Sequence, residues 1–181
     1  MSYPTKAEVA GKIYPLNTDY RVALQCFDII EDPDISDEER ALAVIYKLFG
    51  FVPVDNVQQF MQAAAKFLSC GESQDSHRAR RKDMDFGQDA KYIAASFMSD
   101  YRIDIEAEDM HFWKYYALLC GLTDKCVLSR VRDLRTFDLS EIKDAKTRCK
   151  MAESKQAVAL KPRLSAEEKR AIEEFEALFA E

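Results

Sequence analysis

The chain has 181 residues, of which 48% are hydrophobic and 32% charged, which provides a real core for one domain or two small ones and excludes disorder of the whole chain. Only five glycines and five prolines interrupt it, which argues against a turn-rich β-sandwich and favours an all-α fold of long helices. The net charge of −6, with the acidic excess in the first 75 residues, gives no general attraction for a nucleic-acid backbone, so we do not expect a nucleic-acid partner.

Two further features concern where the protein is found. No stretch approaches the roughly 18 uninterrupted apolar residues that cross a bilayer, and residues 1–11 contain no apolar signal core. The cysteines are widely spaced, which suits buried reduced thiols better than a disulfide framework; they are Cys26, Cys70, Cys120, Cys126 and Cys149. We therefore expect a cytoplasmic protein without a membrane partner.

Residues 1–71 predict a small N-terminal β-hairpin followed by a unit of three helices. Apolar residues flank a turn at Gly11, and Pro15 confines such strands to an edge. Polar residues 17–19 then cap a first helix, whose apolar residues recur at 3.6-residue spacing: Tyr20, Ala23, Leu24, Phe27 and Ile30. The short connections predict that the three helices pack antiparallel.

The second and third helices have clear start and stop signals. Ser36 and Glu39 form a capping box that begins the second helix, and Gly50 ends it. The third pattern begins after Asp55 and is closed by Gly71. The residues expected to face the core are Ala41, Leu42, Ile45, Leu48 and Phe49 in the second helix, and Val57, Phe60, Met61, Ala64, Phe67 and Leu68 in the third.

Residues 72–85 lose apolar periodicity and predict a polar, locally basic linker. Its basic part is Ser76-His77-Arg78-Ala79-Arg80-Arg81-Lys82. We interpret it as a solvated loop, because a few basic residues without aromatic neighbours supply too few phosphate contacts. A nucleic-acid contact or a protease-sensitive hinge is the functional alternative.

Residues 86–160 predict an aromatic-rich helical unit. The spacing of the apolar residues from Ala90 to Tyr101 predicts an amphipathic fourth helix. The next segment, from about Glu106 to Cys120, is apolar or aromatic nearly all round and ends at Gly121. Such a helix is normally central to a domain or covered by a partner, and both alternatives stay open here.

The rest of this unit predicts two more helices. Thr123 or Asp124 is expected to cap a helix with the apolar residues Val127, Leu128, Val131 and Leu134 and with Arg130, Arg132 and Arg135 on its other face. Asp138 with Glu141 is expected to open a longer helix toward Leu160. Residues 125–150 contain eight basic and four acidic groups, a net charge of +4, which is typical of a solvated face or of a surface for an acidic partner.

Residues 161–181 predict a C-terminal amphipathic helix. For the whole chain we expect an all-α helical bundle of about seven helices. Pro162 breaks the chain, and Ser165 with Glu168 forms a second capping box. One face of this helix is apolar: Ala171, Ile172, Phe175, Leu178 and Phe179. A short helix of this kind either packs back on the bundle or docks into a groove of a partner.

The sequence shows no recognisable pattern for catalysis or for a cofactor. Five isolated glycines form neither a dinucleotide fingerprint nor a P-loop. His111, Cys120 and Cys126 fit no zinc-ligand spacing, and His77 and His111 are the only histidines that could activate a nucleophile. We therefore expect a non-enzyme without metal or cofactor.

Two blocks of the sequence form a specific set of motifs. The first is Ile13-Tyr14-Pro15-Leu16-Asn17-Thr18-Asp19-Tyr20-Arg21. The second comprises Asp85-Phe86, Asp89 to Tyr92, Ala95, Phe97, Tyr101, Ile103-Asp104-Ile105, His111-Phe112-Trp113-Lys114, Ala117-Leu118 and Gly121-Leu122, continued by Arg135, Asp138 and Ser140-Glu141-Ile142-Lys143-Asp144. Together these blocks resemble the bacteriophage gene product 15 family, found in phages and prophages of Gram-positive bacteria. The resemblance spans about residues 10–160, including the linker.

The resemblance implies a chaperone of tail assembly for long, non-contractile tails. Its partners would be the tape-measure protein and the tail tube protein, and it would act in the cytoplasm of the bacterial host and be absent from the mature virion. The residues we expect to bind a partner are Phe112, Trp113 and Tyr116, or Phe175, Leu178 and Phe179. A homo-oligomer is compatible with the aromatic helices. The alternative is a helical nucleic-acid-binding or regulatory phage protein that uses its arginines between residues 130 and 148.

Overall fold

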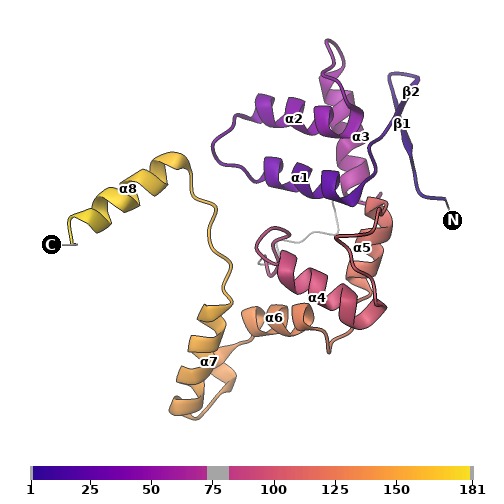
Figure 1. Cartoon of the computed structure of the whole chain (residues 1–181). Coiled ribbons are helices and arrows are strands. Elements are labelled where there is room, and N and C mark those ends of the chain that lie inside the picture. The colour runs from indigo at the N-terminus through magenta and orange to yellow at the C-terminus, as the bar shows by residue number, and fades with distance from the viewer. Residues whose placement is uncertain (1, 73–81, 180–181) are drawn as a thin grey trace. The chain divides into compact units, whose positions relative to one another are not determined.

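The chain begins with the expected β-hairpin. Strand β1 (Lys6–Val9) pairs antiparallel with β2 (Lys12–Pro15), so that Ala7 lies opposite Tyr14 (Figure 1). Gly11 supports the two-residue turn with a φ of +75°, which costs glycine nothing. This computed structural model describes residues 2–72 and 82–179. It divides the chain into two compact units: unit 1 is Met1–Ser73 with Pro162–Glu181, and unit 2 is Gln74–Lys161.

Three helices follow the hairpin in unit 1. They are α1 (Tyr20–Ile30), α2 (Asp37–Phe49) and α3 (Val57–Leu68). Asp19 caps α1 by accepting a hydrogen bond from the backbone N–H of Arg21 at 2.7 Å. Both reciprocal bonds of the Ser36–Glu39 capping box are present, and Gly50 ends α2 in the left-handed conformation, so these local signals act as the sequence predicts.

The core of unit 1 is closed by an aromatic cluster beneath the hairpin. The ring of Phe60 on α3 lies 5.0 Å from the rings of both Tyr14 and Phe49 and 5.5 Å from that of Phe51, all in edge-to-face geometry. This arrangement is favourable for aromatic quadrupoles. It joins the hairpin to the ends of α2 and α3.

Unit 2 contains four α-helices among its described residues. They are α4 (Ala90–Tyr101), α5 (Phe112–Cys120), α6 (Val127–Thr136) and α7 (Ala145–Ala157), with a 3-10 turn, η2 (Leu139–Glu141), before α7. Tyr115 and Phe97 stack in its interior with ring centroids 5.3 Å apart. The fully buried side chains that complete its core are Phe112, Ile93, Leu128 and Ser96.

Three helix starts in unit 2 differ from those expected. Helix α5 begins at Phe112 rather than near Glu106, because His111 Nδ1 accepts the backbone N–H of Trp113 at 3.0 Å and caps it there. Cys126, rather than Thr123 or Asp124, caps α6.

The third difference concerns the end of unit 2. Asp138 caps only the turn η2, and the long helix begins seven residues later at Ala145 under an Asp144 cap. Each of the two carboxylates caps the N-terminus of its own segment, because Asp138 accepts the backbone N–H of Ser140 and Asp144 that of Thr147.

The last helix, α8 (Ala166–Ala177), begins with the second expected capping box. The structure therefore confirms a mostly α-helical fold with a small N-terminal hairpin, and the described residues form eight α-helices. The predicted basic segment 76–82 lies outside the described residues except for Lys82.

Candidate functional site

The most unusual surface of unit 1 is the apolar face of α8. No side chain of this helix is buried. Its apolar residues are exposed to the extent of 43% for Ile172, 61% for Phe175, 76% for Leu178 and 73% for Phe179. The ring centroids of Phe175 on α8 and of Phe179, two residues beyond the end of the helix, lie 4.8 Å apart. This surface, which we call the α8 face, has the composition of a helix that lays an apolar stripe into a partner's groove.

Polar contacts hold the start of α8 at one end of the α1–α2 pair. The guanidinium of Arg163 contacts Asp28 at 2.8 Å and Glu31 at 3.0 Å. The backbone N–H of Ala166 donates to Asp34 Oδ1 at 2.8 Å, a carboxylate at a helix N-terminus. The helix is therefore anchored by its polar end while its apolar end is solvated.

A second exposed apolar surface follows α2. The loop Phe51-Val52-Pro53-Val54 leaves three of its side chains outside: Phe51 is 36% exposed, Val52 53% and Val54 96%. Phe51 continues the aromatic cluster, with its ring 5.7 Å from that of Tyr14. We call Phe51, Val52 and Val54 the loop patch. No sequence signal marked it, because a short apolar loop has no periodicity.

The structure places the six expected contact residues in different environments. Phe112 is fully buried in the core of unit 2, and Trp113 and Tyr116 on the same helix are half-buried. Phe175, Leu178 and Phe179 belong to the α8 face of unit 1. Of the six, these last three offer large apolar area to solvent.

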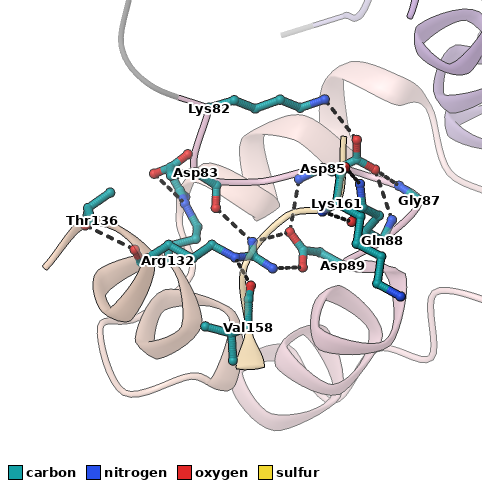
Figure 2. Close-up of polar contacts among 11 residues, drawn as sticks. Lys82, Asp83, Asp85, Gly87, Gln88, Asp89, Arg132, Thr136, Val158 and Lys161 are labelled. Atoms are coloured by element: carbon teal, nitrogen blue, oxygen red, sulfur yellow. Dashed lines mark hydrogen bonds and ion pairs between the residues drawn. The ribbon is translucent and has the colours of Figure 1, made fainter. Parts of the chain in front are cut away.

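Unit 2 contains a polar centre of a different kind, built on Asp89 and Arg135 (Figure 2). Asp89 lies at the start of α4 and Arg135 on α6, and their side chains are 0% and 8% exposed. Both Nη atoms of Arg135 donate to the two carboxylate oxygens of Asp89, each at 2.7 Å. This bidentate hydrogen bonding raises the pKa of Arg135 above its ordinary value, which its burial opposes.

The remaining donors of Arg135 fasten two other segments. Its Nε donates to the carbonyl of Val158 at 2.6 Å and its Nη1 to the carbonyl of Asp83 at 2.9 Å. Asp85 is 3% exposed, and its backbone N–H donates to Asp89 Oδ2 at 3.0 Å. Figure 2 shows that these groups converge from the chain before α4, from α6 and from the chain after α7. Arg135 therefore connects three segments of unit 2, and its charge is balanced by that of Asp89. We call the Asp89–Arg135 pair and these contacts the clamp.

Neither a metal-binding cluster nor a membrane-spanning helix is found among residues 2–72 and 82–179. Within these ranges no group of three or more His, Cys, Asp or Glu side chains could hold a metal ion. No helix there has both the length and the apolar content to cross a membrane. His111 is engaged as a helix cap.

Cys126 is the one thiol in a helix-capping position in the described part of the chain. Burial raises the pKa of this thiol, but hydrogen bonds with Ser129 and Ser96 outweigh burial, so that the pKa is lowered overall. Its side chain is nearly fully buried, and its Sγ accepts the backbone N–H of Ser129 at 3.4 Å. We therefore assign it the role of a cap.

A protein-family model matches most of the chain. The family model described as "Bacteriophage Gp15 protein" matches residues 2–160. The chain belongs to this family. It is accordingly a phage protein. No curated protein and no solved structure matched the chain.

Several residues that carry the resemblance to the Gp15 family have structural roles in this chain. Asp19 caps α1, His111 caps α5, and Asp85, Asp89 and Arg135 form the clamp of unit 2. These positions therefore hold the fold together. The α8 helix lies beyond residue 160, outside the matched region.

Proposed function

We propose that this Gp15 protein is a tail assembly chaperone without enzymatic activity. In this proposal it binds the tape-measure protein, and tube subunits in turn, in the cytoplasm of the bacterial host, and it is left out of the mature virion. The observation that supports this best is the α8 face, an exposed apolar stripe on a polar-anchored helix. The family match supports the phage context.

The physical reasoning starts from the partner. A long helical protein that must stay unassembled exposes apolar stripes, which aggregate unless they are covered. The α8 face is rich in phenylalanine and is flanked by acidic side chains: Glu167, Glu168, Glu173, Glu174 and Glu176. It therefore suits an amphipathic helical segment whose polar flank is basic. Several copies with moderate affinity would cover a long partner and still release it to tube protein.

The structure gives less support to the nucleic-acid alternative. Two of the α6 arginines that it requires are paired with carboxylates: Arg132 with Asp83 at 3.0 Å and Arg135 with Asp89 at 2.7 Å. These ion pairs reduce the positive charge that could meet phosphates.

The test is co-expression with the tape-measure protein of the same phage. We expect wild type to keep that protein soluble and to co-elute with it. The variant Phe175→Asp/Phe179→Asp should lose both effects, because it places charge on the α8 face. The matched control is Ile13→Asp, since Ile13 is 70% exposed on the hairpin and also exchanges a surface apolar side chain for an acid.

Two results would contradict the proposal. One is a tape-measure protein that aggregates equally with and without wild type. The other is equal rescue by wild type and by the Phe175→Asp/Phe179→Asp variant, which would move the contact away from α8. Circular dichroism of each variant verifies that its fold is retained.

A further inference from the structure

Helix α7 is the least buried helix in the described part of unit 2. None of its side chains is buried, whereas α4, α5 and α6 each bury two or three residues. It packs against α6 and η2, with Met151 and Lys155 among its half-buried positions. A helix that buries little apolar surface gains little stability from packing. Polar contacts at its end therefore matter for holding α7 in place.

Two cationic side chains fasten the C-terminal end of α7. The Nζ of Lys155, in the last turn, donates to the carbonyl of Phe137 at 2.6 Å, and the Nε of Arg135 donates to the carbonyl of Val158 at 2.6 Å. Phe137 and Val158 are the C-cap residues of α6 and α7. The two contacts therefore join the ends of both helices through carbonyls that have no partner within a helix.

The chain after α7 is held by the side chain of Gln88, which lies just before α4. Its Oε1 accepts the backbone N–H of Lys161 at 2.8 Å, and its Nε2 donates to the carbonyl of Lys161 at 3.0 Å (Figure 2). Lys161 is the last residue of unit 2. We call these two hydrogen bonds, together with the Lys155–Phe137 and Arg135–Val158 hydrogen bonds, the α7 latch.

The space beside the α7 latch is hollow and largely polar. A cavity of about 180 Å³ lies between the end of α6 and the chain after α7. Two of its lining residues are apolar, and the others are cationic or carry a hydroxyl: Ala159, Leu160, Lys82, Arg135, Lys155 and Thr136. Because dispersion energy requires close contact, a hollow stabilises the closed position of α7 only slightly. The latch therefore provides most of the attachment at this end of the helix.

We infer that α7 opens separately from the rest of unit 2, by release of the α7 latch. In the open state α4, α5 and α6 keep their shared core, and the Asp89–Arg135 pair stays closed because it joins the start of α4 to α6. Residues 143–161 then become a tether between the core of unit 2 and Pro162, where the chain returns to unit 1. The latch thus controls the length of this connection, a role that does not depend on the proposed function.

Hydrogen–deuterium exchange of backbone amides in the full chain tests this inference, because it measures the opening of each segment. Once released, a helix of 13 residues is only marginally stable in water, so its amides exchange. In wild type we expect α7 amides to exchange faster than the slowest amides of α4 and α5, after correction for intrinsic rates.

Two variants weaken the latch. Lys155→Met removes one hydrogen bond and Gln88→Ala removes two. We expect the exchange rate of α7 amides to rise about fivefold in Lys155→Met and about tenfold or more in Gln88→Ala. The matched control is Lys150→Met, the same substitution at an exposed position of α7, which should exchange as wild type does.

Urea unfolding followed by the fluorescence of Trp113, on α5, distinguishes separate opening from a general loss of stability. Both latch variants should keep the wild-type midpoint, because α7 is already open at the urea concentration that unfolds the core. A lower midpoint in the latch variants would overturn the inference, since it would mean that α7 remains attached until the core unfolds. So would wild-type α7 amides as slow as the slowest of α4 and α5, or equal α7 exchange rates in Lys155→Met and Lys150→Met.

Discussion

In the interior of unit 2, Arg135 donates two hydrogen bonds of 2.7 Å to the carboxylate of Asp89, a residue 46 positions earlier in the chain. Because the carboxylate is fully buried and the guanidinium nearly so, neither charge has water as an alternative partner. Removing one partner strands the other, whereas removing both costs much less. The stability of unit 2 therefore depends on both partners of the pair being present together.

The first prediction concerns this clamp. Arg135→Met should lower the free energy of unfolding of unit 2 by about 3–5 kcal/mol, since it leaves Asp89 charged and unpaired. Arg135→Lys should recover only part of this loss, because an ammonium cannot make the two-pronged contact. The double variant Asp89→Leu/Arg135→Met should be less destabilised than Arg135→Met alone.

Trp113, the only tryptophan of the chain, allows this to be measured in unit 2. Its fluorescence during urea unfolding gives the stability of each variant. Arg132→Met is the control, because its ion pair with Asp83 is partly exposed at 41% and 33% and should be worth below about 1 kcal/mol. Equal losses for Arg132→Met and Arg135→Met would refute the clamp.

The second prediction compares two capping boxes with the same geometry. Ser36 begins α2, which buries four residues, and Ser165 begins α8, which buries none. Ser36→Ala should lower global stability by about 1 kcal/mol. Ser165→Ala should reduce helical circular dichroism but leave the urea midpoint unchanged, because unfolding of α8 exposes no core. A shifted midpoint for Ser165→Ala would mean that α8 is packed.

These cases show what the sequence could predict and what it could not. Ser36 and Ser165 act on backbone groups three residues away, so their roles follow from local spacing. The clamp could not be found this way, because Arg135 looks like one more residue of a basic helix face and its partner is distant in sequence. The start of α5 was missed for a similar reason: apolar residues before Phe112 continued the pattern, while His111 supplied an unexpected cap.

The loop patch escaped prediction because Phe51, Val52 and Val54 lie between helices, where no period separates buried from exposed positions. The α8 face was recognised from its 3.6-residue pattern, but the pattern alone left open whether it packs on its own chain. Whether an apolar side chain is buried depends on tertiary packing, and tertiary packing involves residues far away in the sequence.

The third prediction concerns the end of α5. A Cβ atom on Gly121 would lie 2.9 Å from the hydroxyl oxygen of Tyr101, which donates to the carbonyl of Leu118 at 2.9 Å. The φ of Gly121 is −89°, so the backbone accepts alanine. Gly121→Ala should therefore destabilise unit 2 by about 1–2 kcal/mol through this clash and the lost hydrogen bond.

A double-variant cycle separates the clash from other effects of Gly121→Ala. In a Tyr101→Phe background the hydroxyl is absent, and the same substitution should cost clearly less. Unfolding followed by Trp113 fluorescence measures all four proteins. Strict additivity of the two substitutions would contradict this explanation.

The fourth prediction uses the buried thiol of Cys26. Burial raises its pKa to about 12, with the charge of Lys47 as a smaller opposing influence. In the unfolded chain a cysteine has a pKa of about 8.5, so the thiol of the unfolded state loses its proton first as the pH rises. The stabilising contribution of Cys26 is complete below that pH and is lost progressively toward pH 12. By pH 10 the loss should amount to about 2 kcal/mol relative to pH 7.

The measurement is urea unfolding of wild type and Cys26→Ala between pH 7 and pH 10, with the difference between the two proteins plotted against pH. This difference removes the titration of lysines and tyrosines, which both proteins share. Cys149→Ala, at an exposed position, is the control and should follow wild type throughout. A pH-independent difference between wild type and Cys26→Ala would show that the Cys26 thiol ionises in the folded protein as easily as in the unfolded chain.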